Sequence, residues 1–342
     1  MKKIILGLWR SWNAVLATAS SAALCIVAIP AVAQFDENEQ FAQVLQTPYP
    51  WAYTLNTPGV AAVADDGELY RVPGSSLALA LNEIRNLYSP PDWHPGDHPP
   101  MPDIVARGRN PGVFACGYCH LPNGLGRPEN ASVAGLPAEY IVQQMKDYKN
   151  GLRVSAEPTM GPPASMLALA INASDREIAQ AAEYFANLPR LPWIRVIETD
   201  TVPRTRIEGW MLVPIDGGGT EPIGQRIIEM AEDLERTELR DFRSGFIAYA
   251  PTGSVARGEA LVMTGGEGKT VSCGTCHGED LSGLGPVPPL AGRSPSYIVR
   301  QLYDFQTGSR KGAWSELMQE SVAQLTTDDL VSIAAYISSR DP

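Results

Sequence analysis

The sequence CGYCH at residues 116–120 occurs again, with one substitution, as CGTCH at residues 273–277. The 342-residue chain contains five cysteines and four histidines, and the two pentapeptides hold four of these cysteines and two of these histidines. The fifth cysteine, Cys25, lies in an apolar run near the N-terminus. Cysteine and histidine are thus concentrated in one repeated pattern, which indicates that they act together in it.

Paired cysteines in an exported protein form disulfides, zinc centres or covalent haem sites. A disulfide needs no neighbouring histidine, and zinc ribbons place their Cys-x-x-Cys pairs about 15 to 20 residues apart, whereas nearly half of the chain separates these two. In haem attachment, two thiols on the first turn of a helix reach the vinyl groups of one porphyrin, and the next residue places an imidazole beneath the iron. The motifs therefore predict two covalently attached haem c groups, with thioether bonds and proximal iron ligands supplied by Cys116, Cys119 and His120 and by Cys273, Cys276 and His277.

The residues that follow each motif also repeat. EYIVQQMKDYKNGLR (139–153) aligns without a gap with SYIVRQLYDFQTGSR (296–310). In both copies an aromatic residue, a glutamine and a second aromatic residue are four positions apart, which places them on one face of a helix. Gly151 and Gly308 occupy the position where such a helix would end. Each motif is therefore predicted to begin a folding unit of the same plan.

A second helix is predicted to close each unit. Ser174-x-x-Glu177 and Thr326-x-x-Asp329 have the pattern of a capping box, the latter with aspartate in place of the usual glutamate or glutamine. Apolar residues at helical spacing follow each box and predict one buried helix face: Ile178, Ala181, Ala182 and Phe185 in the first copy, and Leu330, Ile333, Ala334 and Ile337 in the second.

Each unit thus contains a haem-binding helix, a glycine-rich loop, a middle helix, a loop with a methionine and a C-terminal helix. This order resembles the bacterial dihaem c-type cytochromes that are built from two class I cytochrome c domains. The resemblance implies a mainly α fold, with two small helical domains that carry electrons through low-spin haem. The expected organisation is a signal peptide at 1–33, an N-terminal extension at 34–105, cytochrome domains at 106–190 and 254–342, and a long, partly irregular linker at 191–253.

The resemblance also implies a methionine as the sixth iron ligand, located before the last helix of each domain. The C-terminal unit contains no histidine other than His277, so a second histidine ligand would have to come from elsewhere. Aligning the last helices places Met166 opposite Met318, each eight residues before its capping residue. This coincidence predicts Met166 and Met318 as axial ligands. Methionines that fill core space are the alternative, and Met160 is the second candidate for the first haem.

Further residues around the motifs have more than one interpretation. Pro286–Pro289 resembles the family's loop in which a backbone carbonyl orients the proximal imidazole, and GRPEN (126–130) is the corresponding segment of the first unit. Four side chains are interpreted either as contacts of the haem edges and propionates or as packing tyrosines and solvated helix ends: Tyr140, Arg153, Tyr297 and Arg310.

The N-terminal residues have the features of a secretory signal. Lys2, Lys3 and Arg10 form a basic start, residues 14–29 are apolar and uncharged, and the small-x-small sequence at 31–33 suits signal peptidase. The apolar run is short for a membrane span. We therefore predict export to the periplasm with cleavage before residue 34, an uncleaved anchor being the alternative.

The regions outside the repeats carry weaker signals. A helix is predicted over 76–88, where it would replace the truncated opening helix of the first unit. The proline-rich loop that follows holds His94 and His98, which are interpreted as metal ligands, as a replacement for Met166 or as ordinary loop residues. In the linker, WIRVIET (193–199) alternates like a strand, and EMAEDLERTELRD (229–241) is predicted to be helical.

These observations predict an electron carrier rather than an enzyme. The formal net charge of -11 argues against nucleic acid as a partner and suits a redox protein with a basic docking surface, although acidity also serves solubility. We expect electron transfer between a dehydrogenase and a downstream cytochrome or oxidase, as a free carrier or a dehydrogenase subunit, with membrane association only through a partner or an uncleaved signal. The alternative is a dihaem enzyme, a peroxidase or sulfur-compound oxidase, with one labile haem site. We predict no catalytic residue, because a ligand candidate is present for both haems.

Overall fold

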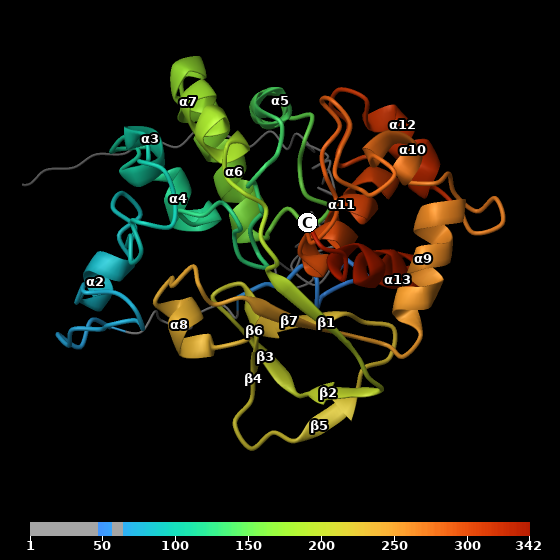
Figure 1. Ribbon diagram of the computed structural model, residues 1–342, viewed down its shortest axis with the longest axis horizontal. Coiled ribbons are helices and arrows are strands. Elements are labelled where there is room, and N and C mark those ends of the chain that lie inside the picture. The colour runs from blue at the N-terminus through green and yellow to red at the C-terminus, as the bar shows by residue number, and fades with distance from the viewer. Residues whose placement is uncertain (1–46, 57–63) are drawn as a thin grey trace, which may run out of the picture. The chain divides into compact units, whose positions relative to one another are not determined.

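The computed structural model describes residues 47–56 and 64–342, so the predicted signal peptide lies outside the described residues (Figure 1). All of the elements belong to one compact unit, Leu45–Pro342. The helices are α2 (Leu81–Ile84), α3 (Asp103–Ala106), α4 (Cys116–His120), α5 (Ala138–Lys149), α6 (Gly161–Asn172), α7 (Asp175–Ala186), α8 (Leu234–Glu238), α9 (Ser254–Thr264), α10 (Gly274–His277), α11 (Pro295–Gln306), α12 (Ser315–Val322) and α13 (Thr327–Ser338). The strands are β1 (Ile194–Glu198), β2 (Thr201–Pro203), β3 (Thr205–Glu208), β4 (Met211–Pro214), β5 (Thr220–Pro222), β6 (Ile228–Ala231) and β7 (Phe246–Ala250).

The closing helices α7 and α13 form as predicted. Ser174 and Thr326 are their N-caps, and each side chain accepts a hydrogen bond from the backbone N–H three residues later, completing a capping box. The predicted apolar stripes of both helices are buried. The middle helices α5 and α11 end just before Gly151 and Gly308, whose φ angles of 67° and 70° lie in the left-handed region that favours glycine.

The prediction that the two candidate methionine ligands lie in loops is wrong. Met166 lies on α6 and Met318 on α12, so both methionines are carried by helices. In α6 the prolines occupy the first turn, where a missing N–H costs no hydrogen bond. The Ala, Leu and Met residues that follow have high helix propensity, which explains why the segment does not remain a loop.

The two repeats differ in the helix that packs across the closing helix. In the second repeat (254–342), α9 crosses α13 closely because Gly258 has no side chain, and a Cβ there would collide with the carbonyl oxygen of Ser332. In the first repeat (106–190), α7 instead contacts the short helix α3, which lies at the end of the extension and reaches the repeat only at Ala106. The helix predicted over 76–88 is reduced to α2, because a β-bridge from Leu79 to Tyr70 occupies the backbone before it.

The linker between the repeats forms β-structure. β1 pairs in parallel with β7, and β7 pairs antiparallel with β6, giving a three-stranded sheet, while β2–β5 and β3–β4 are two-stranded. The strand predicted at 193–199 is confirmed. The helix predicted over 229–241 is wrong at its start, where Ile228–Ala231 forms β6, and only α8 is helical because Asp233 caps its first turn.

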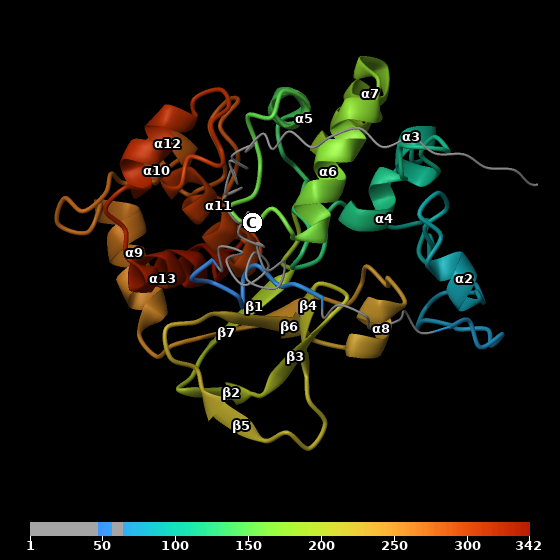
Figure 2. The same cartoon turned by 180° about the vertical axis from the view of Figure 1, so that it is seen from behind.

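The main hydrophobic core joins four regions that are far apart in sequence. It combines the second repeat with linker strands, with residues 49–53 of the N-terminal extension and with Met160 of the first repeat. A separate cluster forms the core of the first repeat, between α3, α5 and α7. In Figures 1 and 2 the strands lie together below the helices of both repeats. The linker is therefore packed against the repeats and is part of the folded body. Within residues 47–56 and 64–342, no helix has both the length and the apolar composition needed to cross a bilayer.

Candidate haem-binding sites

A cavity in the first repeat brings the predicted ligands together. Cys116, Cys119 and His120 line it from α4, and Met166 lines it from α6. Met160, the second candidate, is instead fully buried in the main core. The cavity thus contains two thiols, an imidazole and a thioether, which is the set of donors that a c-type haem requires.

The remaining lining of this cavity is mainly apolar. Ile104, Ile141, Leu169, Ile178 and Phe185 all face the cavity from helices around it. A wall of this kind suits the flat, hydrophobic body of a porphyrin and excludes water from iron. Met145 of α5 also lines the cavity and was not predicted from the sequence. Its position next to Gln144 on the repeated helix could have indicated that it lies near the haem site.

His120 is oriented by a backbone carbonyl. Its Nδ1 lies 2.8 Å from the carbonyl oxygen of Ala131, and because a carbonyl only accepts hydrogen bonds, Nδ1 must carry the hydrogen. The other ring nitrogen, Nε2, then keeps its lone pair for a metal. Burial lowers the pKa of His120, which favours this neutral form. The carbonyl lies one residue beyond the segment 126–130 that was expected to supply it.

The second repeat reproduces this arrangement. His277 Nδ1 lies 2.8 Å from the carbonyl oxygen of Pro288, again eleven residues after the histidine, which confirms the predicted role of Pro286–Pro289. Burial also lowers the pKa of His277. Cys273 and Met318 both pack against the core of this repeat. The two histidines are therefore held in the same tautomer by equivalent backbone groups.

The cysteine environments argue against the competing kinds of site. The four motif cysteines are free thiols in the structure. Burial raises the pKa of Cys116 to about 12 and that of Cys273 to about 11. Thioether bonds leave sulfur uncharged, which suits this burial, and the wide separation of the two Cys-x-x-Cys pairs argues against a zinc ribbon. The donor set and its apolar surroundings therefore fit covalent haem.

Two arginines join the repeats in a nearly symmetrical cluster. Arg153 donates hydrogen bonds of 2.9 Å to Gln144 of its own repeat and to Tyr297 and Gln301 of the other. Arg310 donates a 2.9 Å hydrogen bond to Gln301 of its own repeat. It also donates to two residues of the first repeat, Tyr140 at 2.7 Å and Gln144 at 2.8 Å. Both arginines are buried, so their interpretation as solvated helix ends is wrong.

This arginine cluster borders the first cavity. Arg153 lines it together with Tyr140 and Gln144 from the first repeat and Tyr297 and Gln301 from the second. A cation with neutral hydrogen-bonding partners suits an anionic group such as a propionate. The second repeat therefore contributes side chains to the candidate site of the first.

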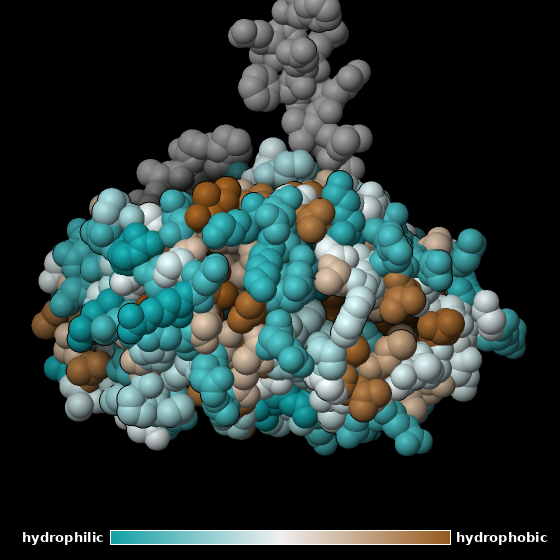
Figure 3. All heavy atoms as spheres, turned by 90° about the horizontal axis from the view of Figure 1, so that it is seen from above, coloured by the Kyte–Doolittle hydropathy of each residue, from teal (hydrophilic) through white to brown (hydrophobic). Residues whose placement is uncertain are grey.

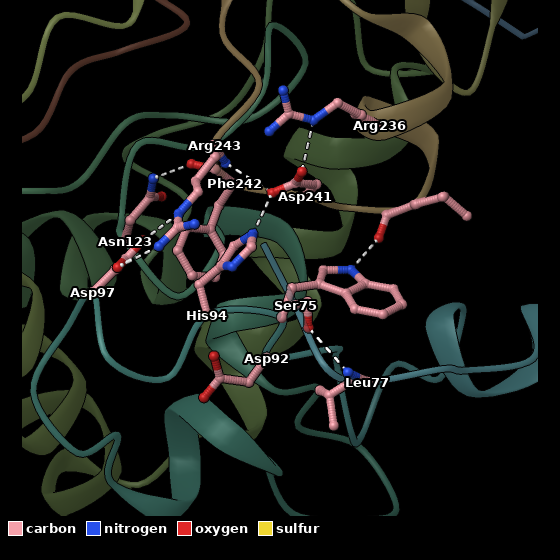
Figure 4. A network of polar contacts seen from close by, with 12 residues as sticks. Ser75, Leu77, Asp92, His94, Asp97, Asn123, Arg236, Asp241, Phe242 and Arg243 are labelled. Carbon is pink, nitrogen blue, oxygen red and sulfur yellow. Dashed lines mark hydrogen bonds and ion pairs between the residues drawn. The ribbon is translucent and has the colours of Figure 1, made fainter. Parts of the chain in front are cut away.

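The two remaining histidines lie outside this cavity. His94 is buried, with Nε2 2.9 Å from Asp241 Oδ1 (Figure 4). His98 bonds to Asp92 and to the carbonyl of Pro99. Neither histidine is among the residues that line the cavity with Met166. Within the part of the chain that the structure describes, no three acidic, cysteine or histidine side chains gather as a metal site.

Comparison with known proteins gives the same result. No protein-family model matches the chain. Cytochrome c-554(548) of Halomonas halodenitrificans is 39% identical over 77 residues, which are 22% of this chain and 93% of that protein. Cytochrome c4 of Azotobacter vinelandii is 26% identical over 227 residues, 65% of this chain and 82% of its own length. The "thiosulfate dehydrogenase electron acceptor" of Stutzerimonas stutzeri is 25% identical over 236 residues, 68% of this chain and 82% of its own length.

The similarity to cytochrome c-554(548) covers nearly all of that small protein, and the similarity to cytochrome c4 spans most of the present chain. The motifs, the paired histidine geometries and these relatives all indicate two sites of one kind. The chain therefore belongs to the dihaem c-type cytochromes, electron-transfer proteins with two class I cytochrome c folds and two covalently attached haem c groups.

Proposed function

We propose that the two haems are held by equivalent residues of the segments 106–190 and 254–342, each folded as a cytochrome c domain. Thioether bonds come from the cysteines, proximal ligation from the histidines and distal ligation from the methionines: Cys116, Cys119, His120 and Met166 for the first haem, and Cys273, Cys276, His277 and Met318 for the second. The observation that carries this proposal is the first cavity, which gathers all four residues of one set.

The protein's own residues prepare each site for electron transfer. A bound haem supplies an iron that alternates between the ferrous and ferric states. The hydrogen bonds from Nδ1 fix both imidazole rings, so they need not reorient when the metal charge changes. The Met166 and Met318 thioethers would supply the remaining iron ligand, which would leave no open position for peroxide or a sulfur compound and would favour a high potential.

The arginine cluster is proposed to couple the two sites electrostatically. Arg153 and Arg310 each hold side chains of both repeats, so the helices α5 and α11 are fixed against one another. The positive charge of Arg153 lies at the first cavity, where it would offset the negative charge of propionates. A rigid, charge-compensated contact of this kind suits electron transfer within one molecule.

We further propose that the protein works in the periplasm as the electron acceptor of a dehydrogenase. Two observations support this role: the similarity to the thiosulfate dehydrogenase electron acceptor, and the extension and linker, which add surface beyond the two cytochrome repeats. A downstream cytochrome or oxidase would then receive the electrons. The dehydrogenase substrate is expected to be a reduced sulfur compound.

Intact mass and a ferrous-minus-ferric absorption spectrum of protein matured in a host with a cytochrome c assembly system test this proposal. We expect the polypeptide mass plus two haem groups, and in the ferric form the near-infrared band that is typical of a sulfur ligand. A mass that corresponds to one haem or none would refute the two-site assignment. Two haems without the sulfur band would refute the methionine ligands.

A further inference from the structure

The two haem-attachment motifs differ in how accessible they are. Cys276 of the second motif is exposed, whereas Cys119, its counterpart, is half-buried. Above the first motif, the Arg240 guanidinium lies 3.5 Å from the centre of the Tyr118 ring and donates a 2.6 Å hydrogen bond to the Tyr118 carbonyl. Thr275, which replaces Tyr118 in the second motif, is exposed. Within the residues that the structure describes, Thr275 and Cys276 are therefore more exposed than their counterparts Tyr118 and Cys119.

The covering of the first motif is a built structure rather than a loose loop. It consists of residues 92–98 from the extension and 236–243 from the linker, here called the cover (Figure 4). Trp93 Nε1 donates to the Leu239 carbonyl at 2.6 Å, and His94 bonds to Asp241 at 2.9 Å. Trp93 and His94 are almost fully buried. These contacts hold the cover in place over the first motif.

The second repeat presents apolar side chains beside Met318, its proposed iron ligand. Leu317 and Ser321 are four residues apart on α12 and share one side of it, and Trp314 is the N-cap residue directly before this helix. Both apolar side chains are 62% exposed. Thr270 Oγ1 donates to the Ser321 carbonyl at 2.6 Å, which ties this loop to the last turn of α12, and the next residue, Val271, is 54% exposed. Leu317 also directly precedes Met318. We call Val271, Trp314 and Leu317 the open face.

Trp314 is unusual in both environment and conformation. Its φ angle of 62° is in the left-handed region, which a bulky side chain rarely adopts, and its ring is exposed. Exposed tryptophan is rare on free surfaces and frequent at the centre of protein interfaces. Figure 3 shows hydrophobic surface around a hollow on its right-hand side, the side on which Figure 1 draws α10 and α12.

The border of the open face is mainly acidic. Glu316 and Glu320 are exposed on α12, and Glu267 is exposed in the loop that leads to Val271. Lys311 is an exposed cation near the start of α12, and Lys269 is paired with Asp329 at 2.5 Å. An apolar centre with a negative rim is complementary to a surface with an apolar centre and a basic rim.

We propose that the open face is the docking surface for the redox partner, a protein whose own exposed cofactor edge is apolar and surrounded by lysine or arginine. The cover excludes this partner from the first repeat. This inference rests on the proposed function, because it assumes that the second repeat carries a haem. It adds that exchange with the partner takes place at the second repeat, and that the first repeat exchanges electrons with the second across the contact that the arginine cluster holds.

Binding and exchange with a basic probe test the proposal. Mitochondrial cytochrome c, a basic one-haem protein, is mixed with the holoprotein, and one electron passes from ferrous iron in one protein to ferric iron in the other. The double variant Glu316→Lys, Glu320→Lys should slow this exchange about tenfold at low ionic strength and weaken the calorimetric affinity similarly. At high salt the difference should disappear, because screening removes the steering. Leu317→Ser should weaken binding at every salt concentration.

Matched variants on the first repeat serve as controls. Glu139→Lys with Glu183→Lys makes the same change of charge, and Ile171→Ser removes an aliphatic side chain that is 60% exposed on α6. We expect much smaller effects from both. Equal slowing by the two charge pairs, or no slowing by either, would overturn the proposal. A wild-type dimer that Leu317→Ser converts to a monomer would also overturn it, since a second copy would then occupy the face. Haem content and the spectrum, measured for every variant, separate this failure from failure of the proposed function.

Discussion

The two repeats begin from nearly the same motif but complete their folds with different parts of the chain. The second repeat uses its own helix α9, eleven residues long, to cross its closing helix. The first repeat has only the four-residue helix α3 in this role. The first motif is also hydrogen-bonded to the extension, because the N–H of Ala115, directly before the motif, donates to the Leu87 carbonyl at 2.9 Å.

This difference shows that one copy of a repeated domain can rely on neighbouring segments of the chain for part of its packing. Trp193 of the linker donates to the Gly126 carbonyl at 3.2 Å, and Arg127 makes a 2.7 Å ion pair with Glu129 while also reaching the Thr237 carbonyl. The first repeat therefore obtains part of its packing from the extension and linker. The second repeat keeps an opening helix of its own and an accessible motif. The following predictions test whether this asymmetry extends to haem attachment, potential and stability.

The largest expected effect is the loss of one haem. Cys276→Ala removes a thioether bond from the accessible second motif, and we expect the mature protein to retain one fully attached haem, in the first repeat. Cys119→Ala should conversely spare the second haem, because that repeat has its own opening helix. Intact mass of proteolytic fragments identifies the haem that remains. Loss of both haems from Cys276→Ala would show that the repeats do not mature separately.

Replacement of an axial ligand should change one potential and leave the haem count unchanged. Met318→His should lower one of the two reduction potentials by on the order of 0.2 V, because imidazole favours ferric iron more than a thioether does, within the roughly 0.8 V range that axial ligands set. Met166→His should lower the other. Spectroelectrochemical titration measures both, and unchanged potentials would exclude these residues as ligands.

Met160 provides a control for the methionine assignment. It is fully buried in the main core and lies outside the first cavity. Met160→Leu conserves volume, so we expect a change of less than about 1.5 kcal/mol in the free energy of unfolding and no change in either potential. A shift of the first potential in this variant would instead make Met160 the ligand.

The arginine cluster should contribute equally to the two repeats. Arg153→Gln and Arg310→Gln each remove three hydrogen bonds from a buried cation, and we expect each to lower the free energy of unfolding by about 2–4 kcal/mol. Urea unfolding, followed by haem absorbance, measures the loss. If one variant lost less than half as much free energy of unfolding as the other, the two arginines would contribute unequally to stability despite their similar contacts.

Local patterns could be predicted from the sequence because their physical causes are local. The capping boxes at Ser174 and Thr326, the glycines after α5 and α11, and the carbonyl beside His277 all depend on residues close together in the chain. The equivalence of Met166 and Met318 came from comparing the two copies. Whether these methionines bind iron remains a prediction, supported in the first repeat by the cavity that Met166 lines.

Features that depend on long-range packing could not be predicted. The Arg153 guanidinium meets Tyr297, 144 residues away, and His94 meets Asp241, 147 residues away. No spacing in the sequence encodes such pairs, and an arginine at a helix end is ordinarily solvated. The strand β6 was missed for a related reason, since its place in a sheet depends on pairing with the distant strand β7.

The smallest expected effect concerns the cover, which has no counterpart over the second motif among residues 47–56 and 64–342. The His98 side chain is buried, and burial lowers its pKa, but the hydrogen bonds to Asp92 and to the Pro99 carbonyl outweigh this and raise the pKa above its ordinary value of 6.5. Only protonated histidine can donate to both acceptors at once. Because the folded-state pKa is raised, its stabilising contribution is fully present below about pH 6.5 and is lost as the pH rises through the folded-state value.

His98→Gln should therefore lower the free energy of unfolding at pH 5.5, and by less at pH 8, where His98 is no longer protonated. The loss at pH 5.5 should be no more than about 1 kcal/mol, because Asp92 is partly exposed and solvent screens the pair. Urea unfolding at both pH values measures this difference between variant and wild type. A loss that is equal at both pH values would mean that His98 acts only through packing against Tyr184 and Phe242, whose rings lie 6.5 Å and 5.7 Å from its own. In that case the cover would be held without a contribution from protonation.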